Sequence, residues 1–216
     1  VRSLSNVSSI KTFDFSTLYT TIPHSKLKSR LKDLVNNAFI GKNGKRRYTY
    51  IVLKYGKTYF VKEHSDKKQK YTESDIIQMI DFLIDNIYVQ FGGNVFQQTV
   101  GIPMGTNCAP LLADLFLYSY KAEFLQQTLK GNNRKQSSFN FTFRYIDDVL
   151  SLNNKKFNDY LDFIYPEELE IKDTTDSNNF ANYLDLHVEF DDKQQLFTKL
   201  YDKRDDFNFS IVNFPF

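Results

Sequence analysis

The stretch FTFRYIDDVLSL, residues 141–152, places two adjacent aspartates in a run that is otherwise typical of a β-strand. Asp147 and Asp148 carry like charges, which repel each other unless water or a cation relieves the repulsion. The simpler interpretation is a tight hairpin turn with both carboxylates solvated, and for this stretch alone it is the favoured one. The alternative is a pair of cation ligands, and the rest of the chain must decide between the two.

The composition is that of a folded protein of one or two domains. The chain has 216 residues, of which 41% are hydrophobic and 25% are charged. Its single cysteine, Cys108, excludes an internal disulfide and a cysteine-rich zinc site, which fits an intracellular protein. His24, His64 and His187 lack the spacing of metal ligands, so we expect surface or turn positions for them. No apolar run approaches the ~18 residues that span a membrane, so we expect no membrane contact.

Charge is distributed unevenly, although the net charge is only +2. Residues 1–40 carry +4, residues 41–72 carry +8, and residues 73–216 carry −10. A basic front and an acidic rear predict one surface for a polyanion and another that collects carboxylates. A solvated basic loop at 41–72 explains the same charge equally well.

Apolar periodicity and turn residues predict a mixed α+β fold without repeats or an interdomain linker. We expect helices at 23–39, 72–91, 108–129 and 154–165, the last ended by Pro166. We expect a strand at 10–15, a basic hairpin within 41–72 with Gly56–Lys57 at its tip, a hairpin at 92–103, the hairpin with the two acids, and strands at 169–173, 182–190 and 196–203. Helices would then cover one face of an antiparallel sheet and leave the other open for a ligand.

Two further motifs accompany the paired aspartates. In FDFSTLYTTIP, residues 13–23, Asp14 lies at the end of an apolar strand, where it is either a helix-capping residue or a second site for a cation. In GIPMGTNCAP, residues 101–110, Gly101 and Gly105 permit a backbone bend before a helix. That loop is either a simple helix entry or a close approach to a ligand, and it matches no dinucleotide or Walker fingerprint.

The three motifs together resemble blocks A, B and C of the reverse transcriptase palm, in order and in approximate spacing. They are most similar to the enzymes of Penelope-like retroelements, which are relatives of telomerase. NYLDLHVEF (182–190) and LFTKLYDKRDDFNF (196–209) are similar to the strands that follow the catalytic hairpin in that group. The resemblance implies a polymerase palm with part of the fingers, and we interpret 1–216 as a partial reverse transcriptase catalytic domain. The N-terminal fingers and the thumb would lie outside it, in a longer protein.

The resemblance implies RNA-directed DNA polymerase activity by two-metal phosphoryl transfer. Asp14 and Asp147 would hold two Mg²⁺ ions, or Mn²⁺ as an alternative, with the Phe15 backbone carbonyl assisting one of them. Asp148 would be the third carboxylate. The partners would be an RNA template, a DNA primer and deoxynucleoside triphosphates, and the expected location is the nucleus.

Further roles follow from the same resemblance. Tyr19 would lie under the sugar of the incoming nucleotide and exclude a 2′-hydroxyl, unless it is a core tyrosine. Met104 and Gly105 would border the base, although many relatives have Gln where Met104 stands. Lys172 is near the position of a lysine that could protonate the leaving pyrophosphate, and a plain surface lysine is the stronger interpretation.

The basic insertion at 41–72 offers Lys45, Arg46 and Arg47 for template or primer phosphates. Two competing functions stay open. One is an RNA-dependent RNA polymerase or a telomerase-type enzyme. The other is a decayed or domesticated fragment that binds nucleic acid without catalysis, although all three aspartates are intact.

Overall fold

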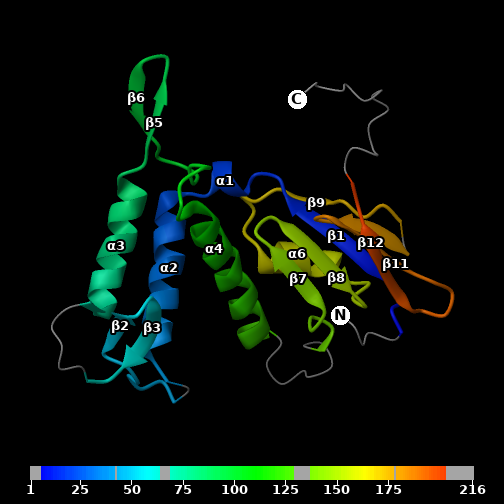
Figure 1. Cartoon of the computed structure of the whole chain (residues 1–216), viewed down its shortest axis with the longest axis horizontal. Helices are drawn as coiled ribbons and strands as arrows, with labels where there is room; N and C mark the ends of the chain where they lie inside the picture. Colours follow the sequence, from blue (N-terminus) through cyan, green and yellow to red (C-terminus); the bar gives the residue numbers. More distant parts are fainter. Residues whose placement is uncertain (1–5, 42, 64–68, 129–136, 178, 203–216) are drawn as a thin grey trace. The chain divides into compact units, whose positions relative to one another are not determined.

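The computed structural model describes residues 6–41, 43–63, 69–128, 137–177 and 179–202 (Figure 1). The chain forms two compact units. Unit 1 consists of Val1–Ser16 and Leu125–Phe216, and unit 2 is Thr17–Phe124. His64 and Lys203, the end of the last predicted strand, lie outside the described residues. No helix within the described ranges is long and apolar enough to cross a membrane.

Unit 1 is built on a four-stranded antiparallel sheet in the order β7-β8-β1-β9. Its strands are β1 (Ile10–Phe15), β7 (Thr142–Tyr145), β8 (Asp148–Leu152) and β9 (Ile171–Asp173). Strand β1 is central because IKTFDF places apolar residues on both of its faces. The predicted strand at 10–15 and the predicted hairpin with the two acids are therefore confirmed.

The two faces of this sheet pack against different partners. On one face, Phe13 contacts Phe157, which lies just before helix α6 (Asn158–Ile164), with ring centroids 5.3 Å apart. Phe15 meets Tyr165 edge to face at 4.8 Å, and burial raises the pKa of Tyr165 to about 12. On the other face, Ile10 belongs to a buried cluster with residues of a second sheet. The expected open face is therefore covered at the Ile10 end of β1.

That second sheet contains β10 (Phe180–Tyr183), β11 (Leu186–Phe190) and β12 (Leu196–Leu200), all antiparallel. Its buried members Ala181 and Val188 complete the cluster with Ile10. The prediction of one strand over 182–190 is wrong, because the chain reverses at Leu184–Asp185. Leu184 has a left-handed φ of 55°, the conformation that two-residue hairpin turns require.

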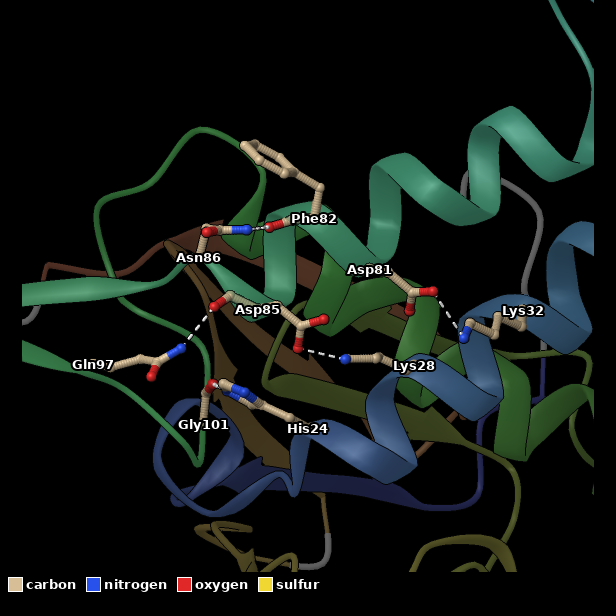
Figure 2. A network of polar contacts seen from close by, with 9 residues as sticks. All are labelled: His24, Lys28, Lys32, Asp81, Phe82, Asp85, Asn86, Gln97 and Gly101. Carbon is tan, nitrogen blue, oxygen red and sulfur yellow. Dashed lines mark hydrogen bonds and ion pairs between the residues drawn. The ribbon is translucent and has the colours of Figure 1, made fainter.

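Unit 2 contains the short α1 (Leu18–Thr21) and three longer helices, α2 (His24–Phe39), α3 (Glu73–Asp85) and α4 (Ala109–Glu123). A π-helix at Phe124–Thr128 continues α4 to about the predicted end. Helix α2 buries Leu27, Leu31 and Phe39, three members of the predicted apolar face. Ion pairs join α2 to its neighbours: Lys28 with Asp85, Lys32 with Asp81 at 2.9 Å, and Arg30 with Glu123 (Figure 2 shows the two to α3).

Helix α3 begins with a capping box, in which the Thr72 hydroxyl accepts from the Asp75 N–H and the Asp75 carboxylate accepts from the Thr72 N–H. It ends at Asp85, so the predicted helix to residue 91 is wrong at this end. Tyr88–Phe91 is instead strand β5, paired with β6 (Asn94–Gln97). Figure 1 shows this hairpin projecting from the end of α3. Tyr88–Phe91 can form a strand because the Gly-Gly turn that follows allows the chain to reverse and pair with β6.

The basic insertion forms a three-stranded sheet in the order β3-β2-β4. Its strands are β2 (Tyr50–Lys54), β3 (Lys57–Val61) and the short β4 (Lys70–Tyr71), which we did not predict. The hairpin is confirmed, but its tip is Tyr55–Gly56 and not Gly56–Lys57, since Lys54 pairs with Lys57. Both tip residues have left-handed φ, 52° and 70°, as a type I′ turn requires.

Candidate active site

The three aspartates lie at one end of the unit 1 sheet. Asp14 is directly opposite Asp148 in the β1–β8 ladder, so the two side chains share a face. Asp147 occupies the turn between β7 and β8, and its carbonyl accepts a hydrogen bond from the Phe15 N–H at 3.1 Å. Residues separated by more than 130 positions are thereby held next to one another by backbone pairing alone.

Electrostatics distinguishes the two adjacent acids. Burial raises the pKa of Asp14, the charge of Asp147 raises it further, and Lys172 acts in the opposite direction. Asp148 acts on a different group: burial first, and then the Asp148 charge, raises the pKa of Tyr183, against the effect of Arg144. Asp147 is thus the electrostatic neighbour of Asp14, whereas Asp148 is the neighbour of Tyr183. Sequence reasoning did not single out Tyr183 or Arg144.

The carboxylates do not form a ready-made metal centre. Within the described ranges, no group of three or more His, Cys, Asp or Glu side chains is arranged to hold a metal ion. The donor types nevertheless suit Mg²⁺, which prefers carboxylate and carbonyl oxygens. The pKa of Asp14 is raised first by burial and then by the charge of Asp147, and a divalent cation would relieve the repulsion between the two carboxylates.

The turn that carries Asp147 has an unusual backbone. Ile146 has a φ of 52°, a left-handed conformation that is rare for a β-branched residue. Its carbonyl accepts a hydrogen bond from Arg144 Nη1 at 2.9 Å. The turn is therefore secured by a side chain from its own hairpin.

Lys172 is paired with Asp14 on the opposite side of β1 from Asp148. It lies 3.5 Å from Glu170 Oε1, an exposed pair. Asp14 is thus flanked in the ladder by one acid and one base. This position is compatible with both interpretations of Lys172, the proton donor and the plain surface lysine.

In unit 2, backbone hydrogen bonds join the end of the motif at 13–23 to the start of the motif at 101–110. The Gly101 N–H donates to the Ile22 carbonyl and the Ile102 N–H donates to the Tyr19 carbonyl, each at 2.8 Å. His24 Nε2–H donates to the Gly101 carbonyl at 2.7 Å (Figure 2). Gly101 has a φ of 83°, and a Cβ there would lie 2.4 Å from the Tyr19 carbonyl oxygen, so only glycine fits.

His24 therefore has a structural role that the sequence did not reveal. Tyr19, in the preceding motif, is half-buried in α1. Met104 is 75% exposed, and Gly105 has a φ of 97° with open space where a Cβ would be. The loop that follows the hydrogen-bonded Gly101 is accordingly open at the two positions expected to border a base.

The three basic residues expected to contact phosphates differ in their surroundings. Arg46 forms an ion pair with Glu73 and lies over the Phe39 ring at 5.8 Å. Arg47 lies over the Tyr48 ring at 5.1 Å, and Lys45 is exposed. An arginine that is already paired offers less charge to a phosphate, so Arg46 is the weakest of the three candidates.

No family model matches the chain, and no curated protein matches it either. Several solved structures are similar to it. One is apo telomerase from Candida tropicalis truncated from its C-terminal domain, with a TM-score of 0.55, 15% identity and 92% of this chain covered. Another is telomerase from Candida albicans in complex with a TWJ fragment of telomeric RNA, with a TM-score of 0.58, 14% identity and 93% covered. This chain has a telomerase-like fold.

A third structure, Candida tropicalis telomerase with the TWJ fragment, gives a TM-score of 0.56 at 16% identity and covers 100% of this chain. The chain spans about a third of these telomerases, 36%, 32% and 32% of their lengths. Identities this low establish the fold alone. The similarity supports the reverse-transcriptase-like architecture expected from the sequence and does not distinguish the Penelope-like group from others.

Proposed function

We propose that this chain is part of the catalytic domain of an RNA-directed DNA polymerase, encoded by a retroelement of Penelope-like type. The observation that carries the proposal is the position of the three aspartates. Asp14 and Asp148 face each other across a ladder, with Asp147 in the adjoining turn, inside a telomerase-like fold. The sequence motifs that resemble blocks A and C contribute these residues. The proposed location is the nucleus.

In the proposed reaction, the oxygen of a primer 3′-hydroxyl attacks the α-phosphorus of a deoxynucleoside triphosphate. A new phosphodiester bond forms between the primer oxygen and the α-phosphorus, the bond to pyrophosphate breaks, and the proton of the hydroxyl passes to water. Asp14, Asp147 and the Phe15 carbonyl would hold Mg²⁺, with Asp148 as the third carboxylate. When bound, the metal supplies charge neutralisation for the attacking and leaving oxygens.

The chain's own residues would then bind and orient. Lys172, whose charge opposes the rise in the pKa of Asp14 caused by burial and by Asp147, would place a cation near the leaving pyrophosphate. Tyr19 would exclude ribonucleotides by volume, and Met104 and Gly105 would border the incoming base. Together with an RNA template and a DNA primer, these residues would select deoxynucleotides.

The test measures nucleotide addition by the chain within its complete reading frame. The substrate is a labelled DNA primer on an RNA template, with deoxynucleotides or ribonucleotides and Mg²⁺ or Mn²⁺. We expect addition of deoxynucleotides, and no addition when the metal is chelated. In a Tyr19→Ala variant, the ratio of kcat/KM for deoxynucleotides over ribonucleotides should fall roughly ten- to two-hundred-fold. An unchanged ratio would mean that Tyr19 is a core residue.

A telomerase-type enzyme is the second candidate, since the solved structures that the chain resembles are telomerases. It would copy a resident RNA repeatedly, whereas a retroelement enzyme would accept templates of any sequence. Comparing addition on unrelated RNA templates separates the two. Binding without any addition would instead support the non-catalytic fragment.

A further inference from the structure

The insertion sheet of unit 2 has one face that is basic and aromatic. Directly opposite residues of an antiparallel ladder share a face, and residues two apart along a strand do as well. One face is therefore defined by four ladder pairs: Tyr50 with Val61, Val52 with Tyr59, Lys54 with Lys57, and Val52 with Lys70. We call it the lysine face: Tyr50, Val52, Lys54, Lys57, Tyr59, Val61 and Lys70.

The opposite face of the same sheet is occupied. Phe60, which alternates with Tyr59, contacts the ring of Phe39 at 5.5 Å and the ring of Tyr48 at 5.3 Å. Phe39 is fully buried at the end of α2. The Phe60 side of the sheet thus contacts the unit 2 core, although Phe60 is itself 41% exposed. On the lysine face, Val52 is buried in the middle of the sheet, and Lys54, Lys57 and Tyr59, toward the hairpin tip, are exposed.

The positive charge of the lysine face has no acidic partner among the residues that the structure describes. Lys54 and Lys57 are directly opposite each other, an arrangement that is unfavourable unless an anion relieves it. No acidic side chain of the described residues forms an ion pair with Lys54, Lys57 or Lys70. By contrast, basic residues of helix α2 and of the segment after it are paired with acids: Lys28, Lys32 and Arg46 all have acidic partners.

The two acids in the first turn of α3 have other partners, and Glu73 forms its ion pair with Arg46. The Asp75 carboxylate accepts hydrogen bonds from the N–H and the hydroxyl of Thr72, both at 2.8 Å. Lys70 instead lies over the Tyr50 ring at 4.7 Å, and Lys54 lies 5.4 Å from the Tyr55 ring. Two of the three lysines, Lys54 and Lys70, therefore lie near aromatic rings, and Lys57 is exposed, so their charge stays available to a polyanion.

Two aromatic rings next to these lysines are open to solvent. Tyr59 is 48% exposed, and Tyr55, at the hairpin tip, is 91% exposed. Exposed rings bordered by lysines are the combination that binds single-stranded nucleic acid, because unpaired bases stack on the rings and phosphates meet the cations. A duplex would offer the phosphates but not the base faces.

We propose that the lysine face and the adjoining hairpin tip bind a single strand of RNA, with phosphates on Lys54, Lys57 and Lys70 and bases on Tyr59 of the face and Tyr55 of the tip. The inference deepens the proposed function. It rests on that function for one point, that the bound strand is the template RNA. It places the principal contacts of the insertion on the sheet, whereas the sequence had suggested Lys45, Arg46 and Arg47.

The first experiment measures binding of a fluorescent single-stranded RNA, about 12 nucleotides long, across a series of salt concentrations. The triple variant Lys54→Ala, Lys57→Ala, Lys70→Ala removes the charge of the face. The matched control is Lys155→Ala, Lys156→Ala, Lys193→Ala, three exposed lysines of unit 1, which changes the net charge equally. We expect the slope of log K against log salt to become shallower by about 2 in the first variant, since each lost phosphate contact is worth about 0.7. Equal changes in both triples would overturn the proposal.

The second experiment tests stacking. Tyr59→Leu keeps an apolar strand residue but removes the ring, and Tyr118→Leu is the control because Tyr118 is 51% exposed on α4. Affinity for the single strand should fall about tenfold in Tyr59→Leu, while affinity for a blunt RNA duplex stays the same. A Tyr59→Leu variant that binds both RNAs like the parent would overturn the stacking assignment.

Failure of this proposal is distinguishable from failure of the polymerase assignment. Asp147→Asn should bind the single strand with the parent's Kd, because the lysine face is unchanged. If the parent adds no nucleotides but binding still depends on the face, the polymerase assignment fails and the binding site stands. If addition occurs and the face triple binds like its control, the binding site fails and the polymerase assignment stands.

Discussion

Two hairpins of this protein reverse the chain with two-residue turns but use different residues to do so. The β5–β6 hairpin of unit 2 turns at Gly92–Gly93, with φ values of 56° and 81°. The β7–β8 hairpin of unit 1 turns at Ile146–Asp147, where Ile146 has a φ of 52°. Glycine adopts this conformation at no steric cost, whereas for a β-branched residue it costs roughly 1–2 kcal/mol. Of the non-glycine residues with left-handed φ that the structure describes, Ile146 is the only β-branched one.

The difference shows where the fold tolerates strain. Strand β8 is buried from Val149 to Leu152 and is paired on both sides, so its packing determines the turn. The residues of β5 and β6 are all exposed, and no buried side chain would hold a strained turn there. Backbone strain persists only where the surroundings over-determine it, and it clusters at functional sites. The strained turn here is the one that holds Asp147 near Asp14.

The largest expected effect comes from exchanging the acid in the strained turn. Asp147→Asn should lower the rate of nucleotide addition about a thousandfold or more, because a shared metal ligand becomes neutral. The matched change, Gly93→Asn, alters the tip of the other hairpin with a residue that tolerates left-handed φ and should leave the rate unchanged. Single-turnover addition of one deoxynucleotide measures both. Comparable rates in the two variants would remove Asp147 from the catalytic site.

The next largest effect is a loss of stability on replacing a glycine. It distinguishes a glycine that is required by its backbone conformation alone from one that is also required by a close contact. Gly101 and Gly93 have similar φ values, 83° and 81°. A Cβ at Gly101 would meet the Tyr19 carbonyl oxygen at 2.4 Å, whereas at Gly93 it would meet nothing within 4 Å. We expect Gly101→Ala to lower the free energy of unfolding by about 3 kcal/mol, from overpacking and backbone strain together, and Gly93→Ala by about 1 kcal/mol. Urea unfolding measures both, and equal losses would contradict the role of the contact.

Much of the fold was predictable from local patterns, and the failures have a common cause. The helix at 23–39 and the acid hairpin are confirmed, since their periodicity and turn residues agree. The errors at 72–91 and 182–190 arose where apolar runs suit either a longer element or two strands around a turn. Only pairing with a partner strand decides between these, and that pairing is not local in sequence.

The candidate site shows the same limit. Asp14 and the paired aspartates could be named from the motifs, but their alignment could not, because β1 gains its neighbours from residues 148–152 and 171–173. His24 gave no signal, since its hydrogen bond to Gly101 joins residues 77 positions apart. The roles of Tyr19 and Met104 stay predictions from the resemblance.

A smaller effect is expected from exchanging the first residues of the two turns. Gly92→Ile should lower the free energy of unfolding by roughly 1–2 kcal/mol, because nothing else contacts a Cβ there and only the left-handed φ of 56° opposes it. Ile146→Gly should change it by less than about 1 kcal/mol, since relief of strain offsets the lost burial of a half-buried side chain. Thermal and urea unfolding of the pair test this. A loss above about 2 kcal/mol in Ile146→Gly would mean that its packing, and not its strain, dominates.

The smallest effect concerns the charge that the acid hairpin imposes on its neighbour, for which the uncharged β5–β6 hairpin has no counterpart. Burial and Asp147 raise the pKa of Asp14 above its ordinary value of 3.8. The folded protein therefore holds this proton more tightly than the unfolded chain, and its stabilising effect is lost as pH rises through the folded pKa. Asp14→Asn should be more stable than the parent at pH 7, by under about 1 kcal/mol because the half-exposed pair is screened by solvent. The gain should vanish only well below the unfolded pKa of 3.8, where Asp14 is protonated in both states.

Asp173, on the neighbouring strand β9, provides a control of opposite sign. Burial raises its pKa, but hydrogen bonds from Thr175 and the nearby Lys11 outweigh this and lower the pKa below 3.8. Its stabilising effect is therefore present above the unfolded pKa and is lost as pH falls through the folded one. Asp173→Asn should be less stable than the parent at pH 7, with the difference shrinking toward acid pH. Urea unfolding from about pH 2 to pH 8 with a chelator present measures both variants without metal. If both substitutions shift stability in the same direction, burial and the charge of Asp147 do not raise the pKa of Asp14.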